Sequence, residues 1–159
     1  MSSLADIDAA PVIDQGRVYA VGQGGRMVAI DMASGQRMWE QNIAGISTPW
    51  AAGEWLFVVT DDARLLAISR GSGKVRWISQ LTHYRNEKKL KGLYGWVGPV
   101  LAGGRLILAN TEGELVSVSP ADGSVISKID VKQPVSLQPI VANNMLYVLD
   151  DKGQLSAYK

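Results

Sequence analysis

The chain has 159 residues, of which 47% are hydrophobic and 19% are charged, a composition typical of a globular domain rather than a disordered one. The formal net charge of +1 gives no electrostatic basis for binding nucleic acid or an anionic membrane. There is no cysteine, which excludes disulfide bonds, thiolate metal sites and cysteine nucleophiles. No apolar run approaches the roughly 20 residues of a membrane-spanning helix, so we expect no membrane span.

The first ten residues are interpreted as a lead-in segment. Residues 1–4 lack the basic and apolar regions of a signal peptide. Ala5, Ile7 and Ala9 then alternate weakly with two aspartates. We therefore expect a soluble fragment cut from the interior of a longer protein.

A turn-centred motif repeats with a period of about 40 residues, which is the sequence signature of propeller blades or solenoid units. It reads A-I-D-M-A-S-G-Q-R-M-W over 29–39 and A-I-S-R-G-S-G-K-V-R-W over 67–77. A third copy, over 117–127, has serine in place of the tryptophan, and a fourth begins at Ala157.

We predict four strands in each complete unit. The first strand follows a proline, a residue tolerated at a strand start because its missing N–H leaves the hydrogen-bond ladder intact. These prolines are Pro11, Pro49, Pro99 and Pro139. The first strands are predicted at 12–13, 50–51, 100–101 and 140–141. The second strands, at 18–21, 55–59, 106–109 and 145–149, are continuously apolar, so we expect them to be covered on both faces. The third strands are predicted at 27–30, 65–68, 115–118 and 155–158.

The fourth strands are predicted around Trp39, around Trp77 and over 125–129, and the last unit has none. Four antiparallel strands per unit predict an all-β fold, a β-propeller fragment of four blades whose last blade lacks its outer strand. We expect the blades at 11–48, 49–98, 99–138 and 139–159.

Glycines close the turn before each fourth strand, in the pattern of a type I turn with a bulge. They are Gly35, Gly73 and Gly123. The tryptophans at matching places in the outer strands, Trp39 and Trp77, could suggest cofactor stacking, but blade-to-blade docking is the favoured interpretation because a large aromatic side chain buries much area between sheets.

No catalytic, cofactor-binding or metal-binding residue is predicted. The glycine-rich stretch 22–25 precedes a strand and lacks the lysine of a phosphate-binding loop. The acidic pairs at 61–62 and 150–151 occupy equivalent turns, which explains them without a metal. The single histidine, His83, has no ligand cluster around it and is expected to be an exposed loop residue.

The one irregular region is 81–95, L-T-H-Y-R-N-E-K-K-L-K-G-L-Y-G, which lengthens the second unit and carries four positive charges against one negative charge. It is either a solvated insertion or a loop that contacts a partner protein with acidic patches, and nucleic acid is the least favoured partner. The candidate partner-contact residues are Tyr84, Arg85, Lys88, Lys89, Lys91, Tyr94 and Trp96.

The repeat resembles the PQQ-type propeller repeat, A-x-D-x-x-[ST]-G-x-x-x-W. The first copy matches in full, the second has Ser69 at the aspartate position, and the third has Ser117, Asp122 and Ser127 at the alanine, serine and tryptophan positions. Within this class, the stretch L-A-D-I-D-A-A-P-V over 4–12 and the ending G-Q-L-S-A-Y over 153–158 are similar to the C-terminal half of the BamB family of outer-membrane assembly lipoproteins.

This resemblance implies one half of an eight-bladed ring without catalytic activity. In the full-length family member it implies a lipid anchor at the N-terminus, a position at the periplasmic face of the outer membrane, and binding to the POTRA domains of BamA, mainly through the other half. The implied function is that of a non-enzymatic scaffold in the machinery that assembles β-barrel proteins into the bacterial outer membrane.

Two other functions stay open. One is a PQQ-dependent redox propeller, although the calcium site, catalytic aspartate and vicinal cysteines that the resemblance to quinoprotein dehydrogenases implies cannot be placed here. The other is a structural fragment with no activity of its own. Because an open half ring leaves apolar faces and a strand edge uncovered, we expect a homodimer that closes an eight-blade ring, in which residues 4–10 supply the missing strand.

Overall fold

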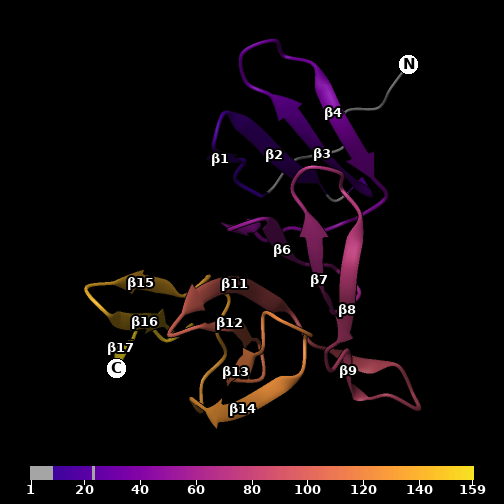
Figure 1. Ribbon diagram of the computed structural model, residues 1–159. Coiled ribbons are helices and arrows are strands. Elements are labelled where there is room, and N and C mark those ends of the chain that lie inside the picture. Colours follow the sequence, from indigo (N-terminus) through magenta and orange to yellow (C-terminus); the bar gives the residue numbers. More distant parts are fainter. Residues whose placement is uncertain (1–8, 23) are drawn as a thin grey trace.

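The computed structural model describes residues 9–22 and 24–159, whose regular secondary structure consists of β-strands (Figure 1). The first sheet is formed by β1 (Val12–Asp14), β2 (Arg17–Gly22), β3 (Arg26–Asp31) and β4 (Arg37–Gln41). The second is formed by β5 (Trp50–Ala52), β6 (Trp55–Val59), β7 (Arg64–Ser69) and β8 (Val75–Gln80). The third is formed by β11 (Trp96–Ala102), β12 (Arg105–Asn110), β13 (Glu114–Val118) and β14 (Val125–Asp130). The fourth has three strands, β15 (Ile140–Ala142), β16 (Met145–Leu149) and β17 (Leu155–Tyr158).

Each sheet is an antiparallel meander in which strands consecutive in the chain are hydrogen-bonded neighbours. The sheets follow one another in chain order, from the indigo first blade to the yellow fourth blade in Figure 1. The predicted fold class is therefore confirmed: an all-β propeller fragment of four blades, the last without its outer strand. No helix in the described part of the chain has the length and apolar character needed to cross a membrane.

The turn before each fourth strand is built around an acidic or hydroxyl side chain. In the first blade the Asp31 carboxylate accepts hydrogen bonds from the Ser34 amide at 2.8 Å and from the Ser34 hydroxyl at 2.7 Å. These two bonds, the hydroxyl first, lower the pKa of Asp31. Gly35 closes the turn at φ 70°, and the ladder shifts register between Ala29 and Ile30. The bulge predicted beside this turn is therefore present.

The core lies between the blades, because the side chains of each strand alternate between two covered faces. We call the side chains that point to the following blade the forward face, and those that point to the preceding blade the rear face. At the first interface the forward face of the first blade packs on the rear face of the second; the fully or almost fully buried members include Tyr19, Val21, Met27, Ala29, Leu56, Val58, Leu66 and Ile68. At the second interface the equivalent residues are Phe57, Val59, Leu65, Ala67, Leu106, Leu108, Val116 and Val118.

The third blade begins earlier than the proline pattern predicted. Strand β11 starts at Trp96, so Pro99 lies inside the strand rather than before it. The pairing with β12 shifts register between Val97 and Val100. Pro99 is accommodated because it falls in this irregularity, where no ladder N–H is required of it.

The segment 81–95, which was expected to be irregular, contains a two-stranded sheet of β9 (Tyr84–Asn86) and β10 (Lys91–Leu93). Figure 1 shows this hairpin projecting from the stack of blades beside the end of β8. Local pairing replaces the expected loop because Asn86 and Lys89 form a tight turn, in which the Asn86 carbonyl accepts the Lys89 amide at 3.2 Å. We call residues 84–93 the basic hairpin.

Candidate functional site: the basic hairpin and the blade interfaces

Trp39 links the first blade to the second. Its indole nitrogen donates a hydrogen bond to the Arg70 carbonyl at 2.8 Å, and its side chain is 8% exposed. The ring covers Gly73 so closely that a Cβ atom there would lie 2.7 Å from it. The Tyr19 ring also lies near the indole, with 6.1 Å between ring centroids. The sequence did not single out this aromatic partner.

Trp77 repeats the arrangement between the second and third blades. Its indole nitrogen donates to the Pro120 carbonyl at 3.1 Å, and its ring covers Gly123 at 2.7 Å from a Cβ position. The Phe57 ring lies 6.0 Å away, measured between centroids. Gly35 stands at the equivalent turn of the first blade, where a Cβ atom would meet nothing within 4 Å.

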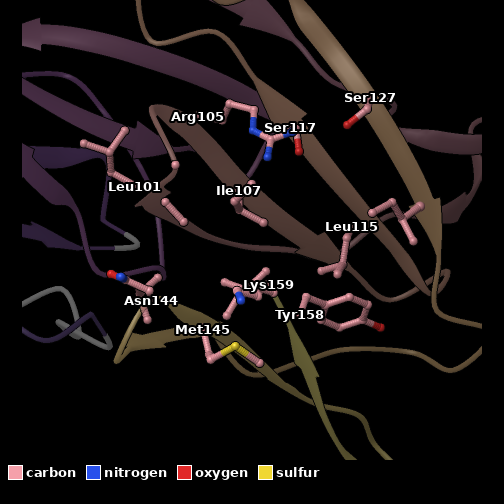
Figure 2. A pocket seen from close by; sticks show the side chains of 15 residues that line it. Leu101, Arg105, Ile107, Leu115, Ser117, Ser127, Asn144, Met145, Tyr158 and Lys159 are labelled. Atoms are coloured by element: carbon pink, nitrogen blue, oxygen red, sulfur yellow. The ribbon is translucent and has the colours of Figure 1, made fainter.

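The interface between the third and fourth blades contains a cleft of about 450 Å³ where the first two interfaces hold a tryptophan. Figure 2 shows Ser117, Ser127 and Ile107 of the third blade on one side of it. Met145 and Tyr158 of the fourth blade lie on the other side. Because Ser127 replaces the tryptophan, this interface is less completely filled.

Arg70 is a structural residue that the sequence analysis missed. It is 3% exposed and forms an ion pair with Asp14. Its Nε donates to the Tyr19 hydroxyl at 3.2 Å, and a terminal guanidinium nitrogen donates to the Gly53 carbonyl at 2.7 Å. Burial disfavours its charge, but the Tyr19 hydroxyl and the Asp14 carboxylate outweigh that effect and raise the pKa of Arg70. The available signal was an arginine at a turn position that Met32 and Pro120 occupy in the other copies.

The acidic pairs take part in turns and ion pairs. The Asp150 carboxylate accepts the amides of Lys152 and Gln154, each at 2.9 Å. The Asp62 carboxylate lies 2.6 Å from the Arg64 guanidinium. Within residues 9–22 and 24–159, no three His, Cys, Asp or Glu side chains are grouped to hold a metal ion. His83 is half-buried rather than exposed, because its ring packs on Tyr84 with 4.2 Å between centroids.

The basic hairpin is fastened to the third blade by Arg85. Its guanidinium donates to both oxygens of the Glu112 carboxylate, from Nε to Oε2 at 2.9 Å and from a terminal nitrogen to Oε1 at 2.6 Å. These bonds and then the Glu112 charge raise the pKa of Arg85. At the base of the hairpin, the Glu87 carboxylate accepts the amides of His83 at 3.3 Å and Tyr84 at 3.2 Å.

Trp96 differs from the other six candidate contact residues because it lies in the core. It is 7% exposed and donates from its indole nitrogen to the Thr82 carbonyl at 2.8 Å. Most of its ring is therefore covered by the blade itself, and the part that stays accessible lines a groove between the blades. Tyr94 stacks on it, with 6.2 Å between centroids, and burial followed by the Glu114 charge raises the pKa of Tyr94.

Three lysines of the basic hairpin point into solvent. None of Lys88, Lys89 and Lys91 forms an ion pair with a residue of the described part of the chain. The last residue of the hairpin, Leu93, lines a groove of about 360 Å³ that runs between the second and third blades. Its lining includes Ile46, Asp61, Leu93, Tyr94, Trp96 and Thr111.

The comparisons with known proteins agree with this architecture. The family model for outer membrane protein assembly factor BamB matches residues 1–79 and 83–159. The chain is 30% identical to the BamB of Alkalilimnicola ehrlichii over 160 residues, which cover 100% of this chain and 39% of that protein. It is 29% identical to the BamB of Salmonella typhimurium, over 97% of this chain and 37% of that protein. The chain thus spans about two fifths of the length of these relatives.

Solved structures show the same fold. The crystal structure of BamB from Moraxella catarrhalis superposes with a TM-score of 0.84 at 20% identity, covering 98% of this chain and 45% of that one. A quinohemoprotein alcohol dehydrogenase from Comamonas testosteroni superposes with a TM-score of 0.71 at 16% identity, covering 91% of this chain and 29% of that one. At these identities, the likeness shows that the fold is shared and nothing about activity.

Alanine substitutions at Gly73 and Gly35 separate two reasons for glycine in this turn, the positive φ and the close packing of a tryptophan ring. Both residues have φ near 70°, so each alanine is expected to cost about 1–2 kcal/mol of unfolding free energy in backbone strain. Gly73→Ala is expected to cost roughly 1–3 kcal/mol more, because the new Cβ displaces the Trp39 ring. Urea unfolding of both variants measures the difference, and equal losses would show that the indole does not pack tightly on the turn.

Proposed function

The chain belongs to the family of outer membrane protein assembly factor BamB, and we propose that it works as a non-enzymatic interaction scaffold. In the full-length protein, this role lies in the machinery that assembles β-barrel proteins into the bacterial outer membrane. The proposed place is the periplasmic face of that membrane, where the lipoprotein binds the POTRA domains of BamA. Since the chain spans 39% of its Alkalilimnicola ehrlichii relative, part of that contact can lie in the rest of the protein.

The observation that carries the proposal is the basic hairpin on a rigid support. Binding residues are often placed on loops that a packed scaffold holds in position. Here the second and third blades, between which the hairpin is inserted, are covered by neighbours on both faces, and Arg85 fixes the hairpin to Glu112 of the third blade. The exposed Lys88, Lys89 and Lys91 then present positive charge at a defined place. Such an arrangement favours recognition of an acidic protein surface.

Charge reversal tests the hairpin in the full-length protein. We expect Lys88/Lys89/Lys91→Glu to reduce capture of the assembly complex at least about tenfold, because the attraction to an acidic partner becomes repulsion. Capture by affinity pull-down from solubilised outer membranes measures the effect. Lys74→Glu, on an exposed turn of the second blade, serves as the control. Undiminished capture by the triple variant would remove the hairpin from the partner surface.

The alternative of a PQQ-dependent redox propeller rests on the fold that the quinohemoprotein dehydrogenase shares with this chain. That likeness concerns the arrangement of the blades, and the repeated tryptophans are occupied with blade docking. We expect equilibrium dialysis of the chain against PQQ and calcium ions to leave no excess of PQQ on the protein side. Retention at micromolar concentrations would overturn the non-enzymatic proposal.

We also propose that two copies of the chain close one eight-blade ring. On the forward face of the fourth blade, Leu149 is 37% exposed and Leu155 is 64% exposed, whereas Val59 and Leu65 at the equivalent places of the second blade are buried. On the first blade, Ile13 is 64% exposed. These two end faces carry apolar side chains, like the pairs of faces that pack together between neighbouring blades, so the two end faces are expected to pack on one another.

The strand that completes the fourth blade is a separate question. Residues 1–8, to which we assigned it in part, lie outside the described residues. Ala9 is 3% exposed and packs in the first core cluster of its own chain. The edge of β17 therefore stays a proposed pairing site for a strand that reaches it from a second copy.

The solution mass tests ring closure. We expect light scattering after size exclusion to give twice the chain mass of 17.1 kDa. Leu155→Asp is expected to return the mass toward 17.1 kDa, because it places a charge in the proposed contact. Leu90→Asp, at a residue that is 65% exposed on the basic hairpin, is the matched control and should leave the dimer intact. A wild-type mass of 17.1 kDa would contradict closure by a second copy.

A further inference from the structure

We propose that the groove beside the basic hairpin binds an extended acidic segment of a partner protein, with one apolar side chain in the groove and carboxylates on the hairpin lysines. The inference rests on the proposed scaffold function and names the chemistry that this surface recognises. It concerns the groove lined by Ile46, Leu93, Tyr94 and Trp96. We call this the hairpin groove.

The hairpin groove is formed where four segments distant in sequence come together. Ile46 comes from the connection between the first two blades, and Asp61 from the turn between β6 and β7. Leu93 ends β10, and Thr111 follows β12. Its volume of about 360 Å³ falls near the lower end of the roughly 300–1,000 Å³ of small-ligand pockets. It therefore suits a single side chain of a narrow segment rather than a broad protein surface.

The walls of the groove are apolar and accessible. Ile46 is 47% exposed and Leu93 is 58% exposed, although both are large aliphatic side chains. Beneath them the stacked pair of Tyr94 and Trp96 forms a fixed floor, since Trp96 is held by its bond to the Thr82 carbonyl. An apolar side chain that enters here covers surface that otherwise stays in water.

The positive charge of the hairpin favours an acidic partner segment. Arg85 is neutralised by Glu112, so it adds little to the field around the hairpin. The exposed cations that remain on the hairpin are Lys88, Lys89 and Lys91, and each can form an ion pair with a carboxylate. The segment is therefore expected to lie with its acidic side toward the hairpin.

The hairpin is already ordered before any partner arrives, which lowers the entropic cost of binding. The Lys89 amide donates to the Asn86 side-chain oxygen at 3.0 Å. Across the hairpin, a Cβ atom at Gly92 would lie 2.9 Å from the Arg85 Cβ atom, so the two strands pack closely. The backbone that carries the lysines is thus held in one conformation by contacts within the hairpin.

An anionic lipid surface is the competing ligand, because the exposed Leu90 and the lysines together resemble a membrane-contacting tip. A bilayer can reach that tip. It cannot place a single side chain between Ile46 and Leu93, which line the groove between neighbouring blades. The groove therefore favours a protein segment, and lipid binding becomes an outcome of the test.

The test uses the full chain and a fluorescein-labelled peptide of alternating glutamate and leucine, followed by fluorescence anisotropy. We expect saturable binding that weakens as salt is added. Leu93→Asn and Ile46→Asn, both at exposed positions and so compatible with folding, should each weaken binding about tenfold without changing its salt dependence. Lys88/Lys89/Lys91→Gln should weaken binding by a similar factor and flatten the salt dependence. Lys74/Arg105→Gln removes two exposed charges that lie outside the basic hairpin and should change neither property.

The outcomes separate the possibilities. Loss of affinity in the lysine variant with full affinity in both groove variants would reduce the site to nonspecific charge and overturn the proposal. Absence of peptide binding, or tighter binding to phosphatidylglycerol vesicles that the same lysines control, would also overturn it. Peptide binding with the expected pattern, together with unchanged capture of the assembly complex by the charge-reversed full-length protein, would keep this inference and contradict the proposed partner surface.

Discussion

The structure depends on the reciprocal covering of apolar sheet faces. A single four-stranded blade has two apolar faces and can cover neither by itself, so each blade depends on its neighbours, and the outer faces of the first and fourth blades stay partly exposed. The tryptophan on the fourth strand adds a directional hydrogen bond to this otherwise nondirectional apolar packing. Trp39 and Trp77 each reach over a turn glycine of the next blade and bond to a carbonyl in that turn. One motif thereby sets the spacing from blade to blade.

The architecture could be predicted because the repeat encodes both partners of this contact. The tryptophan and the turn glycine stand in one motif, and the glycine of the second and third copies receives the tryptophan of the copy before it. Continuous apolar runs such as 55–59 indicated strands covered on both faces, and β6 occupies those residues. The third copy has Ser127 at the tryptophan position, and the cleft before the fourth blade lies there.

The candidate site was less predictable, because its contacts join segments that follow no repeat. Arg85 lies in the basic hairpin and Glu112 in the third blade, and nothing in either local pattern connects them. Trp96 was grouped with the hairpin by sequence proximity, yet it belongs to the first strand of the third blade, which begins before Pro99. Arg70 was missed because a buried arginine depends on partners such as Tyr19 and Asp14, which only the stacking of blades brings near it.

The regular repeat and the proposed contact surface lie in different parts of this chain for a physical reason. Positions inside the blades are restricted by covering on both sides, so a change there alters the contact between neighbouring blades. The segment 81–95 escapes that restriction, since it leaves the stack after β8 and returns only at β11. Its charge can therefore vary without disturbing the core, while Arg85 and Trp96 keep its position fixed. A scaffold built this way can acquire a specific contact surface without any change in the packing that holds the blades together.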